Sequence, residues 1–215
     1  PEDMVKESLR RICEQTGISQ YSSPKGEQIL REQIATSYKK KQARDICADT
    51  EVLVTVGASE GIYLAVKSLV KAHEEVIILE PFFDLYEGAI DSCGAIAKYV
   101  SLKIPDDASS TSEISLDLKA IKEAITKKTK LIIINTPHNP TGKVFSKKEL
   151  ESLAELLEDY PHINILSDEV YEHLVYDGHS HISPRSIDSL RDKTVCLYSA
   201  GKTFSVTGWK IGWSI

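Results

Sequence analysis

The sequence lacks the cysteine patterns that mark metal sites and disulfide scaffolds. Cys13, Cys47, Cys93 and Cys196 are far apart, with no C-x-x-C pair and no histidine at ligand spacing. We therefore expect no metal and no disulfide framework. Because such cysteines suit a reducing compartment, we expect a cytoplasmic protein, with the mitochondrion as the alternative.

Long apolar runs and an excess of basic charge are also missing. The apolar runs are far shorter than the roughly 20 residues that cross a bilayer, and the start of the chain has no signal-peptide pattern. The formal net charge of −6 at pH 7 argues against a nucleic-acid surface. We expect neither a membrane nor a nucleic acid as a partner.

What is present is an ordinary globular composition. The 215 residues are 41% hydrophobic and 27% charged, which suits one good-sized core. The chain begins at Pro1 without a methionine and ends inside an apolar, strand-like run over 209–215. We therefore expect a piece of a longer protein, truncated at both ends.

Hydrophobic periodicity predicts an alternation of strands and helices. Ser59 is expected to be the N-cap of a helix over 59–69, Ser115 or Asp117 that of a helix over 116–125, and Ser146 with Glu149 a capping box for a helix over 147–157. Two earlier helices are expected over 1–12 and from the turn-rich segment 21–26 to residue 41. Strands are expected over 51–56, 76–79, 96–100, 131–134, 163–166 and 195–198. This order predicts an α/β fold, a mostly parallel sheet flanked by helices.

Residues suited to chemistry lie just beyond the predicted strands. Because the carboxyl ends of parallel strands meet at one edge of a sheet, we expect these residues to lie close together. Taken singly, each has a structural explanation: Gly57 to Ser59 as a tight turn, Asp168 as a cap, Tyr171 as core and Asn139 as a turn residue before proline. The candidates are Gly57, Ala58, Ser59, Phe83, Asn135, Asn139, Asp168, Tyr171, Ser199 and Lys202.

Lys202 is the most reactive candidate. It follows a short apolar strand and stands among small residues, and a lysine amine can form a Schiff base with an aldehyde cofactor. Such a lysine needs a neighbouring cation or desolvation to be unprotonated, and Lys210 is a candidate cation. Together with a carboxylate, a phenol, an amide, an aromatic ring and a phosphate cradle, it matches the needs of pyridoxal 5'-phosphate.

Four motifs carry a family resemblance. They are Glu80-Pro81-Phe82-Phe83-Asp84, Asn139-Pro140-Thr141-Gly142, Ser167-Asp168-Glu169-Val170-Tyr171 and the stretch 199–213. In this order they resemble the class I pyridoxal-phosphate-dependent aminotransferases, most closely the kynurenine (glutamine-type) aminotransferase and cysteine-conjugate β-lyase group. The resemblance implies the large domain of a fold-type-I enzyme over 1–215, with 1–50 as its helical N-terminal part and a small C-terminal domain absent from this chain.

The resemblance also implies roles for the site residues. Lys202 would hold the cofactor as a Schiff base and move the proton between the substrate Cα and the cofactor, and Asp168 would pair with the pyridine nitrogen. Many relatives have arginine where Lys210 stands. The remaining cofactor-binding roles would fall to Asn139 and Tyr171 at the phenolic oxygen, Phe83 on the ring, Asn135 nearby, and Gly57, Ala58, Ser59, Ser199 and Lys210 at the phosphate, with Asn139 also binding substrate.

The implied activity is transfer of an amino group from kynurenine, glutamine, or an aromatic or sulfur L-amino acid to a 2-oxo acid. One alternative is β-elimination from cysteine conjugates on the same lysine, and another is a truncated form without turnover. The resemblance further implies a homodimer in which Tyr21 reaches the cofactor phosphate of the neighbouring subunit.

Overall fold

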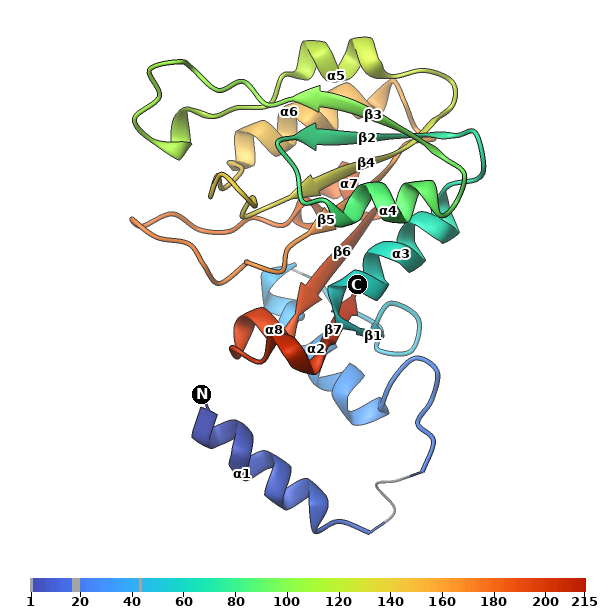
Figure 1. The fold of residues 1–215 in the computed structure, drawn as a ribbon, viewed down its shortest axis with the longest axis vertical. Coiled ribbons are helices and arrows are strands. Elements are labelled where there is room, and N and C mark those ends of the chain that lie inside the picture. The colour runs from blue at the N-terminus through green and yellow to red at the C-terminus, as the bar shows by residue number, and fades with distance from the viewer. Residues whose placement is uncertain (1, 17–19, 43) are drawn as a thin grey trace.

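A computed structural model describes residues 2–16, 20–42 and 44–215 (Figure 1). The strands are β1 (Leu53–Val56), β2 (Glu75–Glu80), β3 (Ile96–Ser101), β4 (Thr129–Asn135), β5 (Asn164–Asp168), β6 (Thr194–Ser199) and β7 (Ile211–Ser214). The α-helices are α1 (Glu2–Cys13), α2 (Gln28–Lys41), α3 (Gly57–Leu69), α4 (Leu85–Asp91), α5 (Leu118–Ala124), α6 (Lys147–Glu158), α7 (Asp188–Arg191) and α8 (Ala200–Thr203). Short 3-10 turns are η1 (Thr111–Glu113), η2 (Pro184–Ser186) and η3 (Thr207–Trp209).

The strands form one mixed sheet in the order β1-β7-β6-β5-β4-β2-β3. Strands β2 to β6 pair in parallel, whereas β7 pairs antiparallel with both β1 and β6. It follows that β1 runs in the same direction as the parallel strands. The carboxyl ends of β1, β2, β4, β5 and β6 therefore meet at one edge, as the sequence predicts.

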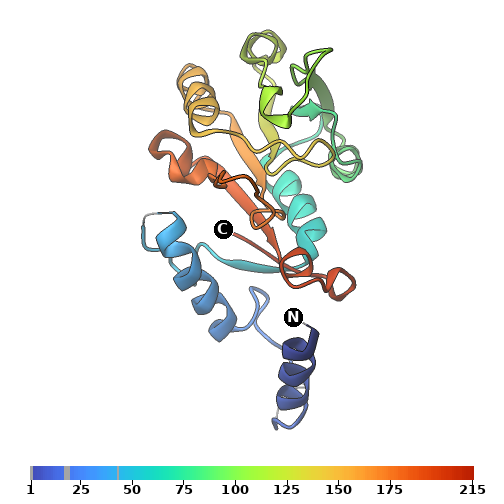
Figure 2. The same cartoon turned by 90° about the vertical axis from the view of Figure 1, so that its left-hand side faces the viewer.

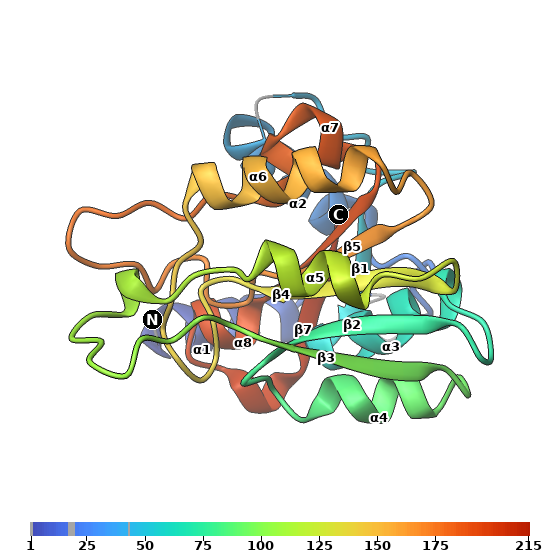
Figure 3. The same ribbon diagram turned by 90° about the horizontal axis from the view of Figure 1, so that it is seen from above.

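Helices cover both faces of the sheet, so the fold has three layers (Figure 3). On one face, α3 and α4 pack against alternate strand residues such as Ile78, Ile133 and Leu197. On the other, α5, α6 and α7 pack against the intervening residues, among them Ile77 and Ile132. Helix α2 extends this second face over β6 and β7. The alternation along each strand decides which layer a side chain enters.

Most predicted elements are confirmed, with one wrong N-cap and one helix that was missed. The capping box of Ser146 and Glu149 is present, and Asp117 rather than Ser115 caps α5. Ser59 is not an N-cap: among the described residues, Val56 occupies that position and no side chain caps α3. The helix starts two residues earlier, at Gly57, where the backbone turns through a left-handed φ of 70° that glycine adopts without strain. Helix α4, which follows the two phenylalanines, was not predicted.

The run over 209–215 forms the end of η3 and then β7. Ile215 is buried, and β7 lies between β1 and β6 inside the sheet. A non-glycine residue in the left-handed region, Lys210 with φ 55°, joins η3 to β7. Only the end of this run joins the core, because Trp209 and Ile211 remain exposed while Gly212 and Ile215 are buried.

Helix α1 lies apart from the sheet (Figure 2). Within the described chain it buries none of its residues. It confirms the helix predicted over 1–12, except that Pro1 lies outside the described residues. The loop after it carries Tyr21, which is fully exposed. A search of the described helices finds none with the length and apolar character needed to span a bilayer.

Candidate active site

One pocket at the carboxyl edge of the sheet collects the predicted residues. Each of them except Tyr21 lines it: Gly57, Ala58, Ser59, Phe83, Asn135, Asn139, Asp168, Tyr171, Ser199, Lys202 and Lys210. Residues that the sequence did not indicate complete the lining: Ile62, Leu85, Tyr86, Val170 and Thr207. The strand ends bring these segments together from across the chain.

The turn from β1 into α3 forms an anion cradle. Gly57 opens the helix with a left-handed backbone, and the first N–H groups of a helix have no partner within it. These donors and the helix dipole favour a phosphate at Ala58 and Ser59. The Nζ atom of Lys210 lies 3.4 Å from the Oγ of Ser59, which adds a positive charge beside the cradle.

The cradle is built against the backbone of β7. A Cβ added at Gly212 would lie 2.6 Å from the backbone N of Ala58 and 2.6 Å from the backbone C of Gly57. Since real Cβ atoms do not approach so closely, only glycine permits this contact. The left-handed Lys210 stands two residues earlier, and strained backbone of this kind concentrates at functional sites.

Asp168 ends β5 and points into the pocket from the α3 and α4 face. Its side chain is 4% exposed, and its carboxylate accepts hydrogen bonds from the Tyr86 hydroxyl at 2.8 Å and the Val170 N–H at 3.3 Å. Among the described residues, no basic side chain forms an ion pair with it, although Lys202 acts at longer range. Burial raises the pKa of Asp168 to about 6, against the lowering effect of these two hydrogen bonds. The pocket thus contains an acidic group whose charge lacks full compensation.

The side-chain amide of Asn135 links the backbone of Asp168 to the backbone of Asn139. The Asn135 amide Nδ2 donates to the carbonyl oxygen of Asp168 at 2.9 Å, and its Oδ1 accepts from the Asn139 N–H at 2.6 Å. Asn135 therefore lines the pocket with both ends of its amide engaged. This bridge fixes the Asn139 loop relative to the end of β5.

Lys202 stands on α8, directly after β6. Its Nζ atom lies 5.6 Å from the centre of the Tyr171 ring, within cation–π range. The side chain is exposed, so the desolvation considered from the sequence is not observed. Phe83 is also exposed, and its ring meets Tyr86 edge to face at 6.1 Å, which leaves a ring face free for a planar ligand.

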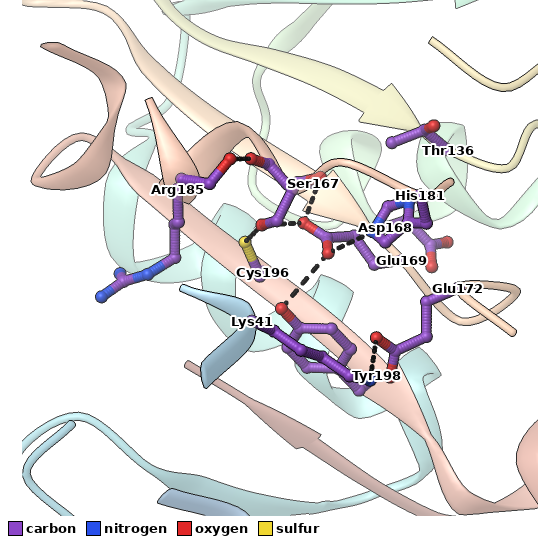
Figure 4. A network of polar contacts seen from close by, with 12 residues as sticks. Lys41, Thr136, Ser167, Asp168, Glu169, Glu172, His181, Arg185, Cys196 and Tyr198 are labelled. Atoms are coloured by element: carbon purple, nitrogen blue, oxygen red, sulfur yellow. Dashed lines mark hydrogen bonds and ion pairs between the residues drawn. The ribbon is translucent and has the colours of Figure 1, made fainter. Parts of the chain in front are cut away.

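Glu169 directly follows Asp168 in the sequence, and its side chain points to the opposite face of the sheet from that of Asp168. Its carboxylate accepts hydrogen bonds from Ser167, Ser183 and Tyr198 and pairs with His181 Nε2 at 2.7 Å (Figure 4). Burial alone would raise the pKa of Glu169, but its hydrogen bonds and His181 hold it below the ordinary value. The protein therefore supplies a complete set of partners for this buried charge.

Among the residues that sequence reasoning missed, Tyr86 and Glu169 bear most directly on the charge of Asp168. Tyr86 lies in the first turn of α4, a helix that was not predicted, and Phe83 precedes that helix. Glu169 adjoins Asp168 in a quoted motif, but its partners come from distant segments. Tyr21 is fully exposed and does not line this pocket; the contact predicted for it is with the cofactor phosphate of a neighbouring subunit.

The chain is an α/β protein whose sheet edge carries a pocket with an anion cradle, a lysine and a buried carboxylate, a lining suited to a small ligand with an anionic group and a cationic group. The whole chain, residues 1–215, matches the family described as aminotransferase class I and II. The chain belongs to this family, whose members are pyridoxal-phosphate-dependent enzymes.

Individual relatives agree with this assignment. The chain is 39% identical to kynurenine--oxoglutarate transaminase of Dictyostelium discoideum, over 100% of this chain and 52% of the relative. It is 41% identical to kynurenine--oxoglutarate transaminase 3 of Bos taurus, over 100% of this chain and 48% of the relative. The solved structure of N-succinyldiaminopimelate aminotransferase from Mycobacterium tuberculosis matches with a TM-score of 0.90 at 39% identity, over 100% of this chain and 54% of that one. The chain spans about half the length of the curated relatives it matches.

Proposed function

We propose that this chain is the large, cofactor-binding domain of an aminotransferase that moves an amino group from an L-amino acid to a 2-oxo acid. Residues 1–50 would be the helical N-terminal part of that domain. The observation that carries the proposal is Asp168, a buried carboxylate that faces the pocket without an ion-pair partner among the described residues. A ligand with a cationic ring nitrogen would supply the missing ion-pair partner of this carboxylate.

The pocket fits pyridoxal 5'-phosphate in its donor chemistry. Bound there, the cofactor would withdraw electrons from the substrate Cα. The anion cradle at Ala58 and Ser59 would hold its phosphate, with the Ser199 hydroxyl and the Lys210 ammonium beside it. Lysine would bind a phosphate as a point charge, whereas arginine would bind it in a bidentate fashion.

The remaining residues would orient the ring and handle the proton. Asn139 and Tyr171 would donate to the phenolic oxygen, and Phe83 would lie against the ring. Lys202 would hold the cofactor aldehyde through its Nζ and, once released from it, would take the proton from the substrate Cα as a general base. Asp168, ionised and opposite the pyridine nitrogen, would keep that nitrogen protonated.

Kynurenine, glutamine, and aromatic or sulfur amino acids are the amino donors we propose. The names of the two curated relatives support kynurenine and 2-oxoglutarate. The Mycobacterium relative has the same 39% identity to this chain as the Dictyostelium relative but is named for a different substrate. Sequence identity alone therefore does not decide between the two substrates. β-Elimination is separated from transamination by its products, pyruvate and ammonia in place of a new amino acid.

The site would be completed in a homodimer. Tyr21 is fully exposed and does not line the pocket of its own chain, which suits a contact with the cofactor phosphate of a second copy. In this arrangement, each pocket would use residues from two chains.

Borohydride reduction of the cofactor-loaded full-length protein tests the assignment of Lys202. We expect the cofactor to be fixed covalently on the peptide that contains Lys202, and a Lys202→Ala variant to remain unlabelled. A Lys210→Ala variant is the matched control, because it removes a lysine of the same pocket but should keep the label. Label on Lys210 in the unmodified protein would overturn the assignment.

A further inference from the structure

The carboxylate of Asp168 is held from two sides. The Tyr86 hydroxyl donates to Oδ2 at 2.8 Å, and the Val170 N–H donates to Oδ1 at 3.3 Å. The hydroxyl contact is the shorter of the two and comes from a different layer of the fold, the helix α4. Tyr86 therefore controls the oxygen that the neighbouring backbone does not reach.

Tyr86 is itself firmly placed. Its side chain is 2% exposed and packs in the core between α3, α4 and the sheet. Burial, followed by the charge of Asp168, raises the pKa of Tyr86, so the hydroxyl keeps its proton and acts as a donor. A fixed ring gives this donor one direction, toward Asp168.

We propose that Tyr86 is a positioning residue that aims the Asp168 carboxylate into the pocket and keeps it ionised for a cationic ring nitrogen. The inference rests on the proposed function, since it concerns how this pocket would receive a pyridine cofactor. Other titratable groups near Asp168 are Lys202 from α8, Glu169 after β5 and Tyr171 beyond it. Of these, Lys202 favours the ionised carboxylate and Glu169 opposes it.

The size of the effect follows from the hydrogen bond. A bond to a charged group shifts the balance between ionised and protonated carboxylate by about 10-fold to 100-fold. Without the hydroxyl, Asp168 would stay protonated to a higher pH. A protonated carboxyl group cannot form an ion pair with a pyridinium. As the pH is lowered, a protein without the Tyr86 hydroxyl would therefore lose cofactor affinity at a higher pH than the unmodified protein.

The test measures the dissociation constant of pyridoxal 5'-phosphate against pH for the full-length protein. For Tyr86→Phe we expect affinity about 10-fold weaker or more near neutral pH, with the fall in affinity moved to higher pH by about one pH unit or more. Tyr198→Phe is the matched control. Tyr198 is 1% exposed, and its hydroxyl serves Glu169 rather than Asp168, so the pH dependence should stay as in the unmodified protein.

A second replacement guards against a Tyr86→Phe variant that does not fold. 3-Fluorotyrosine at position 86 keeps the shape and makes the hydroxyl a stronger donor, so the fall in affinity should move to lower pH. In an Asp168→Asn background, Tyr86→Phe should produce no pH shift.

The outcomes separate this inference from the proposed function. If the unmodified protein binds no cofactor, both fail. If it binds the cofactor and is labelled on Lys202, but Tyr86→Phe or fluorination leaves the pH profile in place, the inference alone is overturned. If Tyr86→Phe weakens cofactor affinity but leaves its pH dependence unchanged, the inference is also overturned, because loss of a purely structural role would give that result.

Discussion

Asp168 and Glu169 are adjacent, equally buried carboxylates that the fold treats in opposite ways. A carboxylate accepts about four hydrogen bonds. Glu169 has four polar partners, Ser167, Ser183, Tyr198 and His181, whereas within the described chain Asp168 has two, Tyr86 and Val170. Alternation along the strand sends them to opposite faces of the sheet.

We interpret the difference as a division of roles, in which the charge of Glu169 serves the fold and, under the proposed function, that of Asp168 would pair with a ligand. The pKa of Glu169 is lowered because the protein stabilises its charge, and the pKa of Asp168 is raised to about 6 by burial. A buried charge is costly unless it is paired. The charge of Asp168 is therefore the one that lacks a full set of partners within the described chain, and substitutions at the two carboxylates should have different effects.

Asp168→Asn should have the largest effect. In the full-length protein with saturating cofactor, we expect turnover to fall by on the order of 10²–10³-fold, because a neutral amide cannot keep the pyridine nitrogen charged. The exposed Asp159→Asn is the control for loss of a carboxylate. Near-normal turnover of Asp168→Asn would remove this residue from the mechanism.

Glu169→Gln should act on stability. The amide places an NH₂ group among hydroxyl donors that need an acceptor, so the apo protein should lose about 3 kcal/mol of its free energy of unfolding. Urea denaturation measures this loss, with the exposed Glu158→Gln as the control. A loss no larger than that of the control would show that the Glu169 network is dispensable.

Asp168→Asn should have the opposite effect on the apo protein. The pKa of this residue rises on folding from 3.8 to about 6, so above pH 6 the ionised carboxylate costs the folded state stability. The variant should be more stable at pH 8, by up to about 3 kcal/mol.

This gain has a defined pH window. It should shrink as the pH falls below 6 and vanish below 3.8, where Asp168 is protonated in both states. Denaturation of both proteins across this range measures it. A variant less stable than the unmodified protein at pH 8 would contradict the idea of an uncompensated charge.

Tyr21→Phe should have the smallest effect, on the part of the site that a second copy would complete. Loss of one hydrogen bond to a charged group should weaken cofactor retention in the full-length dimer by about 1.5–3 kcal/mol. Tyr176→Phe, also on an exposed residue, is the control. Unchanged retention, or a fully active monomer in sedimentation, would exclude a shared site.

The sequence predicted the parts of the fold that depend on local pattern. The apolar run at 131–134 became part of β4, and the capping box of Ser146 and Glu149 begins α6, because both signals lie within a few residues. Ser59 was wrongly predicted as a cap, because α3 already begins at Gly57, with Val56 as its N-cap.

The candidate site was predictable as a set of strand ends but not as a network. Parallel strands bring their carboxyl ends together, so Asn135, Asp168 and Lys202 could be grouped without coordinates. The bond from Tyr86 to Asp168 spans 82 positions, and that from Tyr198 to Glu169 spans 29. No local pattern encodes such contacts, so the contrast between the two carboxylates appears only in three dimensions.

The most direct test of this contrast is an NMR titration of the two carboxyl groups in the full-length protein, with and without pyridoxal 5'-phosphate. We expect Asp168 to titrate near pH 6 without cofactor and below its ordinary value of 3.8 with it, because a cationic nitrogen then stabilises the charge. Glu169 should titrate below its ordinary value in both states, because its hydrogen bonds and His181 stabilise its charge with or without cofactor. An Asp168 that titrates at or below 3.8 without cofactor, or whose titration is unchanged by it, would contradict the account.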